Sequence, residues 1–287
     1  MQLRQILNAA IERLAAAQVP SPRLNAEILI MFTLGCDRAY LYAHPERHLS
    51  SQELEQYEGA LSLRSTGMPA QYITGHQEFW GMDLIVSPAV LIPRPETEHL
   101  IETVLALIEK RPMVTAAPHK PIRVVDVGTG SGAIALALAA EIPSAEIDAV
   151  DISADALNVA RANAARHEVG SRVQFYERDL LDGFAPDSFD FVVSNPPYVG
   201  ESEEDTVQLE VRRFEPHNAV FAGHSGTEVI ERLIPQAWTA LRTGGWLILE
   251  ISGTIADRVR ALLNDWNSVE LKNDLQGIAR VAVAQKP

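Results

Sequence analysis

The chain has little cysteine and no excess of positive charge. A single cysteine, Cys36, among 287 residues excludes an internal disulfide and a thiolate-cluster metal site, which suits a reducing compartment. Cys36 itself is expected to be a small core residue. The formal net charge of −14 argues against broad adhesion to nucleic acid, because such binding is mostly neutralisation of phosphates by lysine and arginine.

The sequence also lacks a long hydrophobic run. Its longest uncharged apolar stretch, residues 127–140, is too short to span a bilayer and is interrupted by glycines. Near the N-terminus Arg4, Glu12 and Arg13 lie within a helical pattern, which is not the pattern of a signal peptide. The eight histidines show no metal-ligand spacing, so no metal site is expected. We therefore expect a soluble, cytoplasmic protein.

The composition, 47% hydrophobic and 22% charged, is that of a folded globular protein with room for one large and one small domain. Apolar residues at helical spacing from Leu3 to about Leu63 predict a helical domain over residues 1–66. Short extended runs, Gln71–Gly75 and Met82–Val86, predict a β-hairpin linker over residues 67–94. The remainder, residues 95–287, is expected to form the large domain.

The large domain alternates helices and strands. Pro95 should open a helix, and residues 111–121 form a proline-bearing loop. Apolar runs then predict a series of strands at Ile122–Val127, Ile147–Val150, Val173–Tyr176, Phe189–Ser194 and Trp246–Ile251. Such alternation indicates an α/β fold whose mostly parallel sheet is covered on both faces and binds ligands at the carboxyl ends of its strands.

A glycine loop follows the first of these strands and runs into a helix. Glycines there let the backbone approach a nucleotide-like cofactor at the helix N-terminus; the loop is Gly128, Thr129, Gly130, Ser131 and Gly132. Asp151 ends the second strand, where a carboxylate can accept hydrogen bonds from both ribose hydroxyls of NAD or of S-adenosylmethionine. Asp151 could instead cap the helix that follows, although Ser153 and Asp155 can also do so.

The fourth strand ends at the tetrapeptide Asn195-Pro196-Pro197-Tyr198, which can hold a planar nitrogen. An amide or aromatic amine is a poor nucleophile because its lone pair is delocalised. Two acceptors on its N–H bonds, the Asn195 oxygen and the Pro196 carbonyl, would aim that lone pair, and the Tyr198 ring would fix the plane. Asn-Pro is also a common turn, but the position at the ligand-binding edge favours a functional role.

The tetrapeptide favours S-adenosylmethionine over NAD. A hydride-transfer enzyme needs a proton donor or acceptor near the nicotinamide, and no histidine follows an obvious strand end there. A nitrogen clamp needs an electrophile, which the sulfonium methyl group supplies. The residues themselves leave open whether an adenine amine or a glutamine amide is the acceptor.

The chain resembles the release factor glutamine methyltransferases, the HemK/PrmC family, over nearly its whole length. Besides the glycine loop and the tetrapeptide, three segments carry the resemblance: Pro69-Ala70-Gln71-Tyr72-Ile73-Thr74-Gly75, Val90-Leu91-Ile92-Pro93-Arg94-Pro95-Glu96-Thr97-Glu98 and Asp274-Leu275-Gln276-Gly277-Ile278-Ala279-Arg280. The second is far more specific than the tetrapeptide, which DNA and RNA amino-methyltransferases also carry. Residues 252–256 depart from the family's Gly and Gln, so a substrate contact by that loop is not carried over.

The resemblance implies a Rossmann-like class I S-adenosylmethionine-dependent methyltransferase domain with a seven-stranded, mostly parallel sheet. It implies methylation of the side-chain amide nitrogen (N5) of the glutamine in the Gly-Gly-Gln motif of class-1 peptide chain release factors, which modulates translation termination. The cofactor would be lined by Gly128 to Gly132, Asp151, Leu180 and Asn195. Asn195 to Tyr198 would hold the substrate amide, with Asn195, Pro196 and Tyr198 catalytic, and residues 1–66 would help to grip the release factor.

Several alternatives stay open. An amino-methyltransferase of nucleic acid would need a target-recognition segment, and the chain after Tyr198 is mostly used by the remaining sheet and helices. A non-catalytic protein would bind the cofactor and transfer nothing. Leu180 could be ordinary core, and Arg94 could pair with the cofactor carboxylate or with Glu96 or Glu98. The stretch Glu201–Asp205 could be a lid or a solvated loop. We expect a monomer with no nucleic-acid substrate and no membrane association.

Overall fold

The computed structural model describes residues 2–110 and 121–287, and the chain divides into two compact units. The first unit comprises the chain up to His76 together with Gln208–Phe214, and the second comprises Gln77–Val207 and Glu215–Pro287. Residues 111–120 of the predicted proline-bearing loop lie outside the described residues.

The first unit is helical, as expected. Its helices are α1 (Leu3–Ala16), α2 (Pro22–Leu34), α3 (Arg38–Ala43), α4 (Ser51–Ser65), α5 (Ala70–Thr74) and α9 (Leu209–Phe214). Apolar faces of α1, α2 and α4 bury a common core that includes Leu14, Leu29 and Leu61. Tyr57 lies within this core, and its hydroxyl group donates to the Ala26 carbonyl at 3.0 Å, so the buried polar atom is satisfied.

A buried arginine ties α9 to the rest of the first unit. Arg64, at the end of α4, is only 2% exposed and donates to Glu210 at 2.6 Å, to Asn25 at 2.7 Å and to the Met68 carbonyl at 3.0 Å. A charge that is removed from water needs such partners to offset the cost of desolvation. The ion pair therefore holds a segment that is distant in sequence against α4.

The predicted extended run Gln71–Gly75 is wrong. It forms helix α5 and its C-cap, where the Gly75 amide donates to the Gln71 carbonyl at 2.7 Å and Gly75 adopts a φ of +77°. The β-branched side chains of Ile73 and Thr74 favour a strand locally, but a single hydrogen-bonded turn closed by glycine prevails. The hairpin itself lies further on, as β1 (His76–Phe79) and β2 (Met82–Ile85), with positive φ at both turn residues, Trp80 and Gly81.

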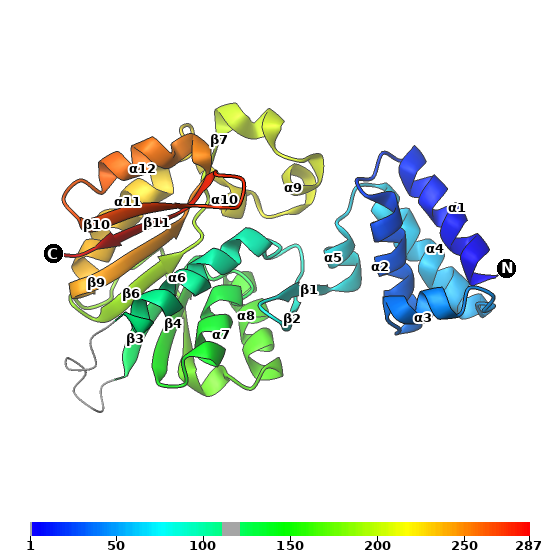
Figure 1. The fold of residues 1–287 in the computed structure, drawn as a ribbon, viewed down its shortest axis with the longest axis horizontal. Helices are drawn as coiled ribbons and strands as arrows, with labels where there is room; N and C mark the ends of the chain where they lie inside the picture. The colour runs from blue at the N-terminus through cyan, green and yellow to red at the C-terminus, as the bar shows by residue number, and fades with distance from the viewer. Residues whose placement is uncertain (1, 111–120) are drawn as a thin grey trace. The chain divides into compact units, whose positions relative to one another are not determined.

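The second unit contains a seven-stranded sheet in the order β10-β11-β9-β6-β3-β4-β5 (Figure 1). Its strands are β3 (Ile122–Val127), β4 (Ala145–Asp151), β5 (Val173–Glu177), β6 (Phe189–Ser194), β9 (Leu241–Glu250), β10 (Asn267–Asn273) and β11 (Ala279–Gln285). Among these strands β11 runs antiparallel to the other six, so the expected seven-stranded, mostly parallel α/β sheet is confirmed. A separate parallel pair joins β7 (Val199–Gly200) to β8 (Phe221–Gly223).

Helices cover both faces of the sheet. The helices of the second unit are α6 (Glu98–Glu109), preceded by a 3-10 turn at Pro95–Thr97, then α7 (Ala133–Glu141), α8 (Ala154–Arg166), α10 (His217–Val220), which contacts β8, α11 (Glu228–Ala240) and α12 (Ala256–Leu262). Short 3-10 turns lie at Gly170–Arg172, Glu201–Thr206 and Gly253–Ile255. The helix predicted to open at Pro95 thus has its proline in an initial 3-10 turn.

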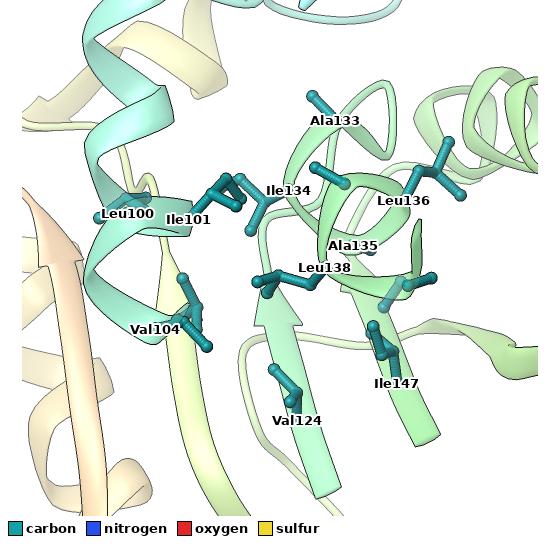
Figure 2. Close-up of a cluster of buried hydrophobic side chains, with 14 of the residues drawn as sticks. Leu100, Ile101, Val104, Val124, Ala133, Ile134, Ala135, Leu136, Leu138 and Ile147 are labelled. Atoms are coloured by element: carbon teal, nitrogen blue, oxygen red, sulfur yellow. The ribbon is translucent and has the colours of Figure 1, made fainter. Parts of the chain in front are cut away.

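Alternate residues of each strand supply two cores. Val124 and Ile147 pack under α6 and α7, where Ile101 and Ile134 meet, as Figure 2 shows. Val125, one residue further along β3, packs on the opposite face in the cluster that contains α11 and α12. This two-residue alternation buries both faces of β3 and leaves its carboxyl end as the place where polar groups can gather.

Candidate active site

The carboxyl ends of β3, β4 and β6 surround a cavity of about 350 Å³ in the second unit. A cavity of this size is in the range that holds a small ligand. Among the predicted site residues, its wall includes Gly128, Thr129, Gly130, Ser131, Asp151, Leu180, Asn195 and Pro197, but not Gly132, Pro196 or Tyr198. The structure therefore gathers most of the predicted residues at one place.

A buried carboxylate, that of Asp126, holds the glycine loop and the helix after it by hydrogen bonds. Asp126 is fully buried, and its Oδ2 accepts from the Thr129 hydroxyl at 2.6 Å and from the Ala135 amide at 3.1 Å. Burial raises the pKa of Asp126 to about 7, while these two hydrogen bonds limit the rise. Gly132, with a φ of +84°, begins α7, and a Cβ atom there would lie 3.2 Å from Ala160 Cβ. Gly132 therefore acts by letting α7 approach α8 rather than by lining the cavity.

Asp151, at the end of the next strand, is hydrogen-bonded to the glycine loop. Its Oδ2 accepts the Gly130 amide and its Oδ1 accepts the Ser153 amide, both at 2.9 Å. Burial raises the pKa of Asp151, and the backbone hydrogen bonds oppose that rise. Ser153 is the N-cap of α8, with its hydroxyl oxygen accepting from the Ala156 amide, so the helix does not need Asp151 as its cap.

Two apolar side chains, Leu180 and Ile152, line the cavity together with Asp151. Leu180 is half-buried, lines the cavity and also packs against the core cluster of α11. Ile152 is 61% exposed although it is a large apolar residue, and it also lines the cavity. Ile152 was not predicted as a site residue, because its only signal in the sequence is an isoleucine in the position after the strand-ending carboxylate.

The tetrapeptide leaves β6 next to the glycine loop. Ser194, the last residue of β6, donates its hydroxyl to the Val127 carbonyl at 2.6 Å, which joins the ends of the two strands. Asn195 is half-buried on the cavity wall, and its Nδ2 donates to Thr97 Oγ1 at 3.2 Å. Tyr198 is also half-buried, and its hydroxyl donates to Glu250 Oε1 at 3.0 Å.

Thr97 and Glu250 complete this arrangement, and the sequence analysis assigned a role to neither. Thr97 precedes α6 but does not cap it; its hydroxyl donates instead to Glu250 Oε2 at 2.6 Å. Glu250, the last residue of β9, is 2% exposed, and its burial raises the pKa of its carboxyl group, against the hydrogen bonds from Thr97 and Tyr198. Burial and then the charge of Glu250 raise the pKa of Tyr198. The Glu250 carboxylate thus accepts hydrogen bonds from the hydroxyl groups of both Thr97 and Tyr198.

A second glycine fits tightly against the tetrapeptide. A Cβ atom on Gly226 would lie 2.7 Å from the Tyr198 carbonyl oxygen and 3.0 Å from the Gly200 amide nitrogen. Gly226 has a φ of +80°, which L side chains rarely adopt. The loop after β8 can therefore support the Tyr198 backbone only with glycine at this position.

The remaining expectations concern charged residues. Arg94 pairs with Glu215, and not with Glu96 or Glu98, while Glu215 also accepts the Ile92 amide at 3.1 Å. The acidic stretch forms the mostly exposed 3-10 helix Glu201–Thr206. Among residues 2–110 and 121–287, no group of three or more histidine, cysteine or acidic side chains could hold a metal ion. In the same part of the chain, no helix is both long enough and apolar enough to cross a bilayer.

Comparisons with known proteins agree with this geometry. Residues 5–75 match the protein family described as PrmC N-terminal domain, and residues 111–213 match the family described as Methyltransferase small domain. The solved structure of the hMettl16 catalytic domain in complex with MAT2A 3'UTR hairpin 6 is similar in fold, with a TM-score of 0.57 and 18% identity, over 88% of this chain and 93% of that chain. The family match of residues 111–213 and the fold together identify a class I methyltransferase domain.

Two curated relatives narrow the assignment. The release factor glutamine methyltransferase of Koribacter versatilis is 53% identical over 290 residues, covering 100% of this chain and 99% of that protein. The protein of the same name from Escherichia coli (strain K12) is 38% identical over 287 residues, covering 99% of each. The chain belongs to the family of release factor glutamine methyltransferases, which confirms the resemblance on which the sequence analysis relied.

Proposed function

We propose that this enzyme transfers a methyl group from S-adenosylmethionine to N5 of the glutamine in the Gly-Gly-Gln motif of class-1 release factors, and so modulates translation termination. The observation that carries the proposal is the position of Asn195, on the wall of the cavity with its amide nitrogen already bonded to Thr97. Its oxygen is then available as an acceptor for an N–H group. The family to which the chain belongs supports glutamine as the source of that group.

The residues around the cavity fit S-adenosylmethionine. Asp151 offers carboxylate oxygens with remaining lone pairs for ribose hydroxyls, and the glycine loop at the start of α7 offers backbone amides. The face of the cofactor's adenine ring would cover the exposed Ile152 side chain and Leu180. When bound, the cofactor supplies a methyl group on a positively charged sulfur, open to attack by a nitrogen lone pair.

The tetrapeptide would orient the acceptor amide. Asn195 Oδ1 and the Pro196 carbonyl would each accept a hydrogen bond from one N–H group, which favours a nitrogen lone pair out of conjugation and stabilises the positive charge that grows on the nitrogen. As the N–C bond forms, the S–C bond breaks to leave a neutral thioether, and the nitrogen then loses one of its two protons to solvent. Pro197 brings no N–H group that could compete for the Pro196 carbonyl. The Tyr198 ring, held by the hydrogen bond from its hydroxyl to Glu250, would restrict the orientation of the plane of the substrate amide.

The helical region would contribute to recognition of the protein substrate. We assign residues 1–66 to release factor binding, residues 67–94 to a hairpin linker and residues 95–287 to catalysis, in a monomer that works in the cytoplasm. The match of residues 5–75 to the PrmC N-terminal domain supports the first assignment. Most residues that line the cavity lie within 95–287, which supports the last, while Ala89, Val90, Leu91 and Pro93 of the linker segment complete its wall.

The test is to incubate the purified protein with methyl-labelled S-adenosylmethionine and a class-1 release factor. A second reaction uses a release factor whose Gly-Gly-Gln glutamine is replaced, and a third uses total RNA. Label should appear only in the unmodified release factor, and mass spectrometry of the peptide should locate it on that glutamine. Label in both release factors, in neither, or in RNA instead would overturn the proposal.

A further inference from the structure

Asn195 and Tyr198 are joined through side chains from two distant segments. Asn195 Nδ2 donates to Thr97 Oγ1 at 3.2 Å, Thr97 Oγ1 donates to Glu250 Oε2 at 2.6 Å, and the Tyr198 hydroxyl donates to Glu250 Oε1 at 3.0 Å. The three segments come from the start of α6, the end of β6 and the end of β9. The first and last residues of the tetrapeptide are therefore linked by hydrogen bonds to the same buried carboxylate.

While Glu250 is ionised, the donors and acceptors along this chain of hydrogen bonds can be arranged in only one direction. An ionised carboxylate can only accept hydrogen bonds, so the Thr97 hydroxyl must donate its single proton to Glu250. The lone pairs of Thr97 Oγ1 are then all that face Asn195, and only the amide nitrogen of Asn195 can satisfy them. The Asn195 oxygen must consequently point away from Thr97.

A reversed Asn195 would spoil the site. Its NH₂ group would then face the N–H groups of the methyl acceptor, and two sets of donors cannot bond to each other. An outward oxygen, by contrast, accepts from the amide nitrogen of a substrate and rejects the amide oxygen. The same atom would therefore both hold the nitrogen and select it over the neighbouring oxygen of the acceptor amide.

We propose that Glu250 and Thr97 are positioning residues that fix the amide of Asn195 with its oxygen toward the methyl acceptor. The inference rests on the proposed transfer to an amide nitrogen, and it deepens that proposal by naming what sets the orientation. Glu250 acts at a distance through Thr97, and it fixes Tyr198 directly. Thr97 also lines the cavity, but the role proposed for both residues is positioning, because each acts through Asn195 or Tyr198.

The burial of Glu250 supports a role beyond packing. Glu250 lies between apolar neighbours, Leu249 and Ile251, that are fully buried at the end of β9. Placing a carboxylate there costs desolvation free energy that an apolar side chain would not. Its two oxygens are used for hydroxyl groups that belong to, or contact, the tetrapeptide, so the cost is offset where the acceptor would bind.

The variants that test this are Glu250→Gln and Thr97→Val, with Thr97→Ser as the conservative variant. The glutamine amide can donate to Thr97, which frees the Thr97 proton to bond to the Asn195 oxygen and reverse the amide. Glu250→Gln and Thr97→Val should lower kcat by about 10- to 100-fold, as for other residues that orient a reacting group, with KM for the release factor changed far less. Thr97→Ser keeps the hydroxyl and should restore kcat to within a few-fold of wild type.

Thr103→Val is the matched control. Thr103 is a buried threonine of α6 that accepts a hydrogen bond from Lys272 at 3.1 Å, away from the cavity. It should leave kcat unchanged while costing comparable stability in thermal unfolding. Equal losses of kcat in Thr97→Val and Thr103→Val would overturn the inference.

A double-mutant cycle shows whether Thr97 acts through Asn195. In an Asn195→Ala background, Thr97→Val should lower kcat no further, because the group that it positions is gone. A full, additive loss would overturn the inference. The cycle uses kcat with release factor, so a readout independent of transfer is also needed.

That readout is the ¹⁵N-resolved side-chain NH₂ signal of Asn195, assigned by its loss in Asn195→Asp. Its exchange with solvent should be slow in the wild type and at least several-fold faster in Thr97→Val, but unchanged in Thr103→Val. Unchanged exchange in Thr97→Val contradicts the orientation chain. A wild-type protein that shows the expected exchange but methylates no release factor would instead contradict the proposed function alone.

Discussion

The Asp151 carboxylate accepts the Gly130 backbone amide at 2.9 Å, so the loop that follows β3 is fastened to the end of β4. Removal of this carboxylate should affect both the loop and the ribose hydroxyls that it would bind. We expect Asp151→Ala to weaken binding of S-adenosylhomocysteine by roughly 10- to 100-fold, since hydrogen bonds to charged groups contribute about 1.5–3 kcal/mol. Calorimetry measures this directly, and an unchanged Kd would remove Asp151 from the proposed cofactor site.

Asn195→Ala should separate transfer from cofactor binding. Loss of one preorganised polar contact lowers turnover by about 10²–10³-fold in other active sites, and we expect the same here. Binding of S-adenosylhomocysteine should fall much less, because Asn195 is one of many residues in the cavity wall. Turnover equal to that of the wild type, measured with labelled cofactor and release factor, would rule out the amide clamp.

Gly226→Ala should disturb Tyr198 by direct contact. The added methyl group would lie 2.7 Å from the Tyr198 carbonyl oxygen, in addition to the strain of a φ of +80°. Gly277 has the same φ of +80°, but a methyl group added there would meet no atom within 4 Å, so Gly277→Ala measures the backbone strain alone, about 1–2 kcal/mol. Denaturant unfolding should show a larger loss for Gly226→Ala, accompanied by reduced turnover. Equal losses in the two variants would mean that the contact relaxes without cost.

The pKa of Asp126 predicts a pH dependence of stability. Because the folded-state pKa is about 7, above its ordinary value of 3.8, the native state holds this proton more tightly than the unfolded state. The contribution to stability is fully present below about pH 4 and is lost as the pH rises toward and through 7. Between pH 5.5 and 8.5 the loss should be about 2 kcal/mol.

Asp126→Asn isolates this contribution, since its side chain does not titrate. The difference in unfolding free energy between wild type and variant should therefore change in favour of the variant by that amount as the pH rises. A difference that stays constant from pH 5.5 to 8.5 would show that Asp126 is already ionised in the native state.

Arg64→Ala should release α9 from the first unit. Truncation leaves the Glu210 carboxylate without its buried partner, and breaking a buried pair costs about 3–5 kcal/mol. Limited trypsin digestion should then cut faster at Arg212 and Arg213. Arg13→Ala is the control, because the Arg13–Glu58 pair is exposed and such pairs contribute about 0–1 kcal/mol. Equal digestion rates in the two variants would contradict the prediction.

Features that depend on local sequence could be predicted. The β-branched runs of β3 and β6 mark buried parallel strands, and both Asp151 and Asn195 stand where such strands end, which is where the structure places them at one cavity. The extended segment predicted around Ile73 was wrong because its β-branched side chains favour a strand, and nothing else in the local sequence indicates a single helical turn.

Features that depend on the order of strands could not be predicted in the same way. Glu250 and Thr97 are 153 residues apart, and they meet because α6, which follows Thr97, packs against β9. The same holds for Arg94, whose partner Glu215 is 121 residues away, whereas the sequence offered nearer glutamates. A pairing between distant polar residues has no periodicity from which it can be inferred.

The assignment of Gln208–Phe214 to the first unit has a consequence for how the protein can be divided. The chain passes from one unit to the other at three peptide bonds, 76/77, 207/208 and 214/215, rather than at one. A fragment that ends at His76 would expose the Arg64 guanidinium and the surface that α9 covers. The helical region is thus completed by a segment inserted from the catalytic half of the sequence, and neither half of the gene by itself encodes all of it.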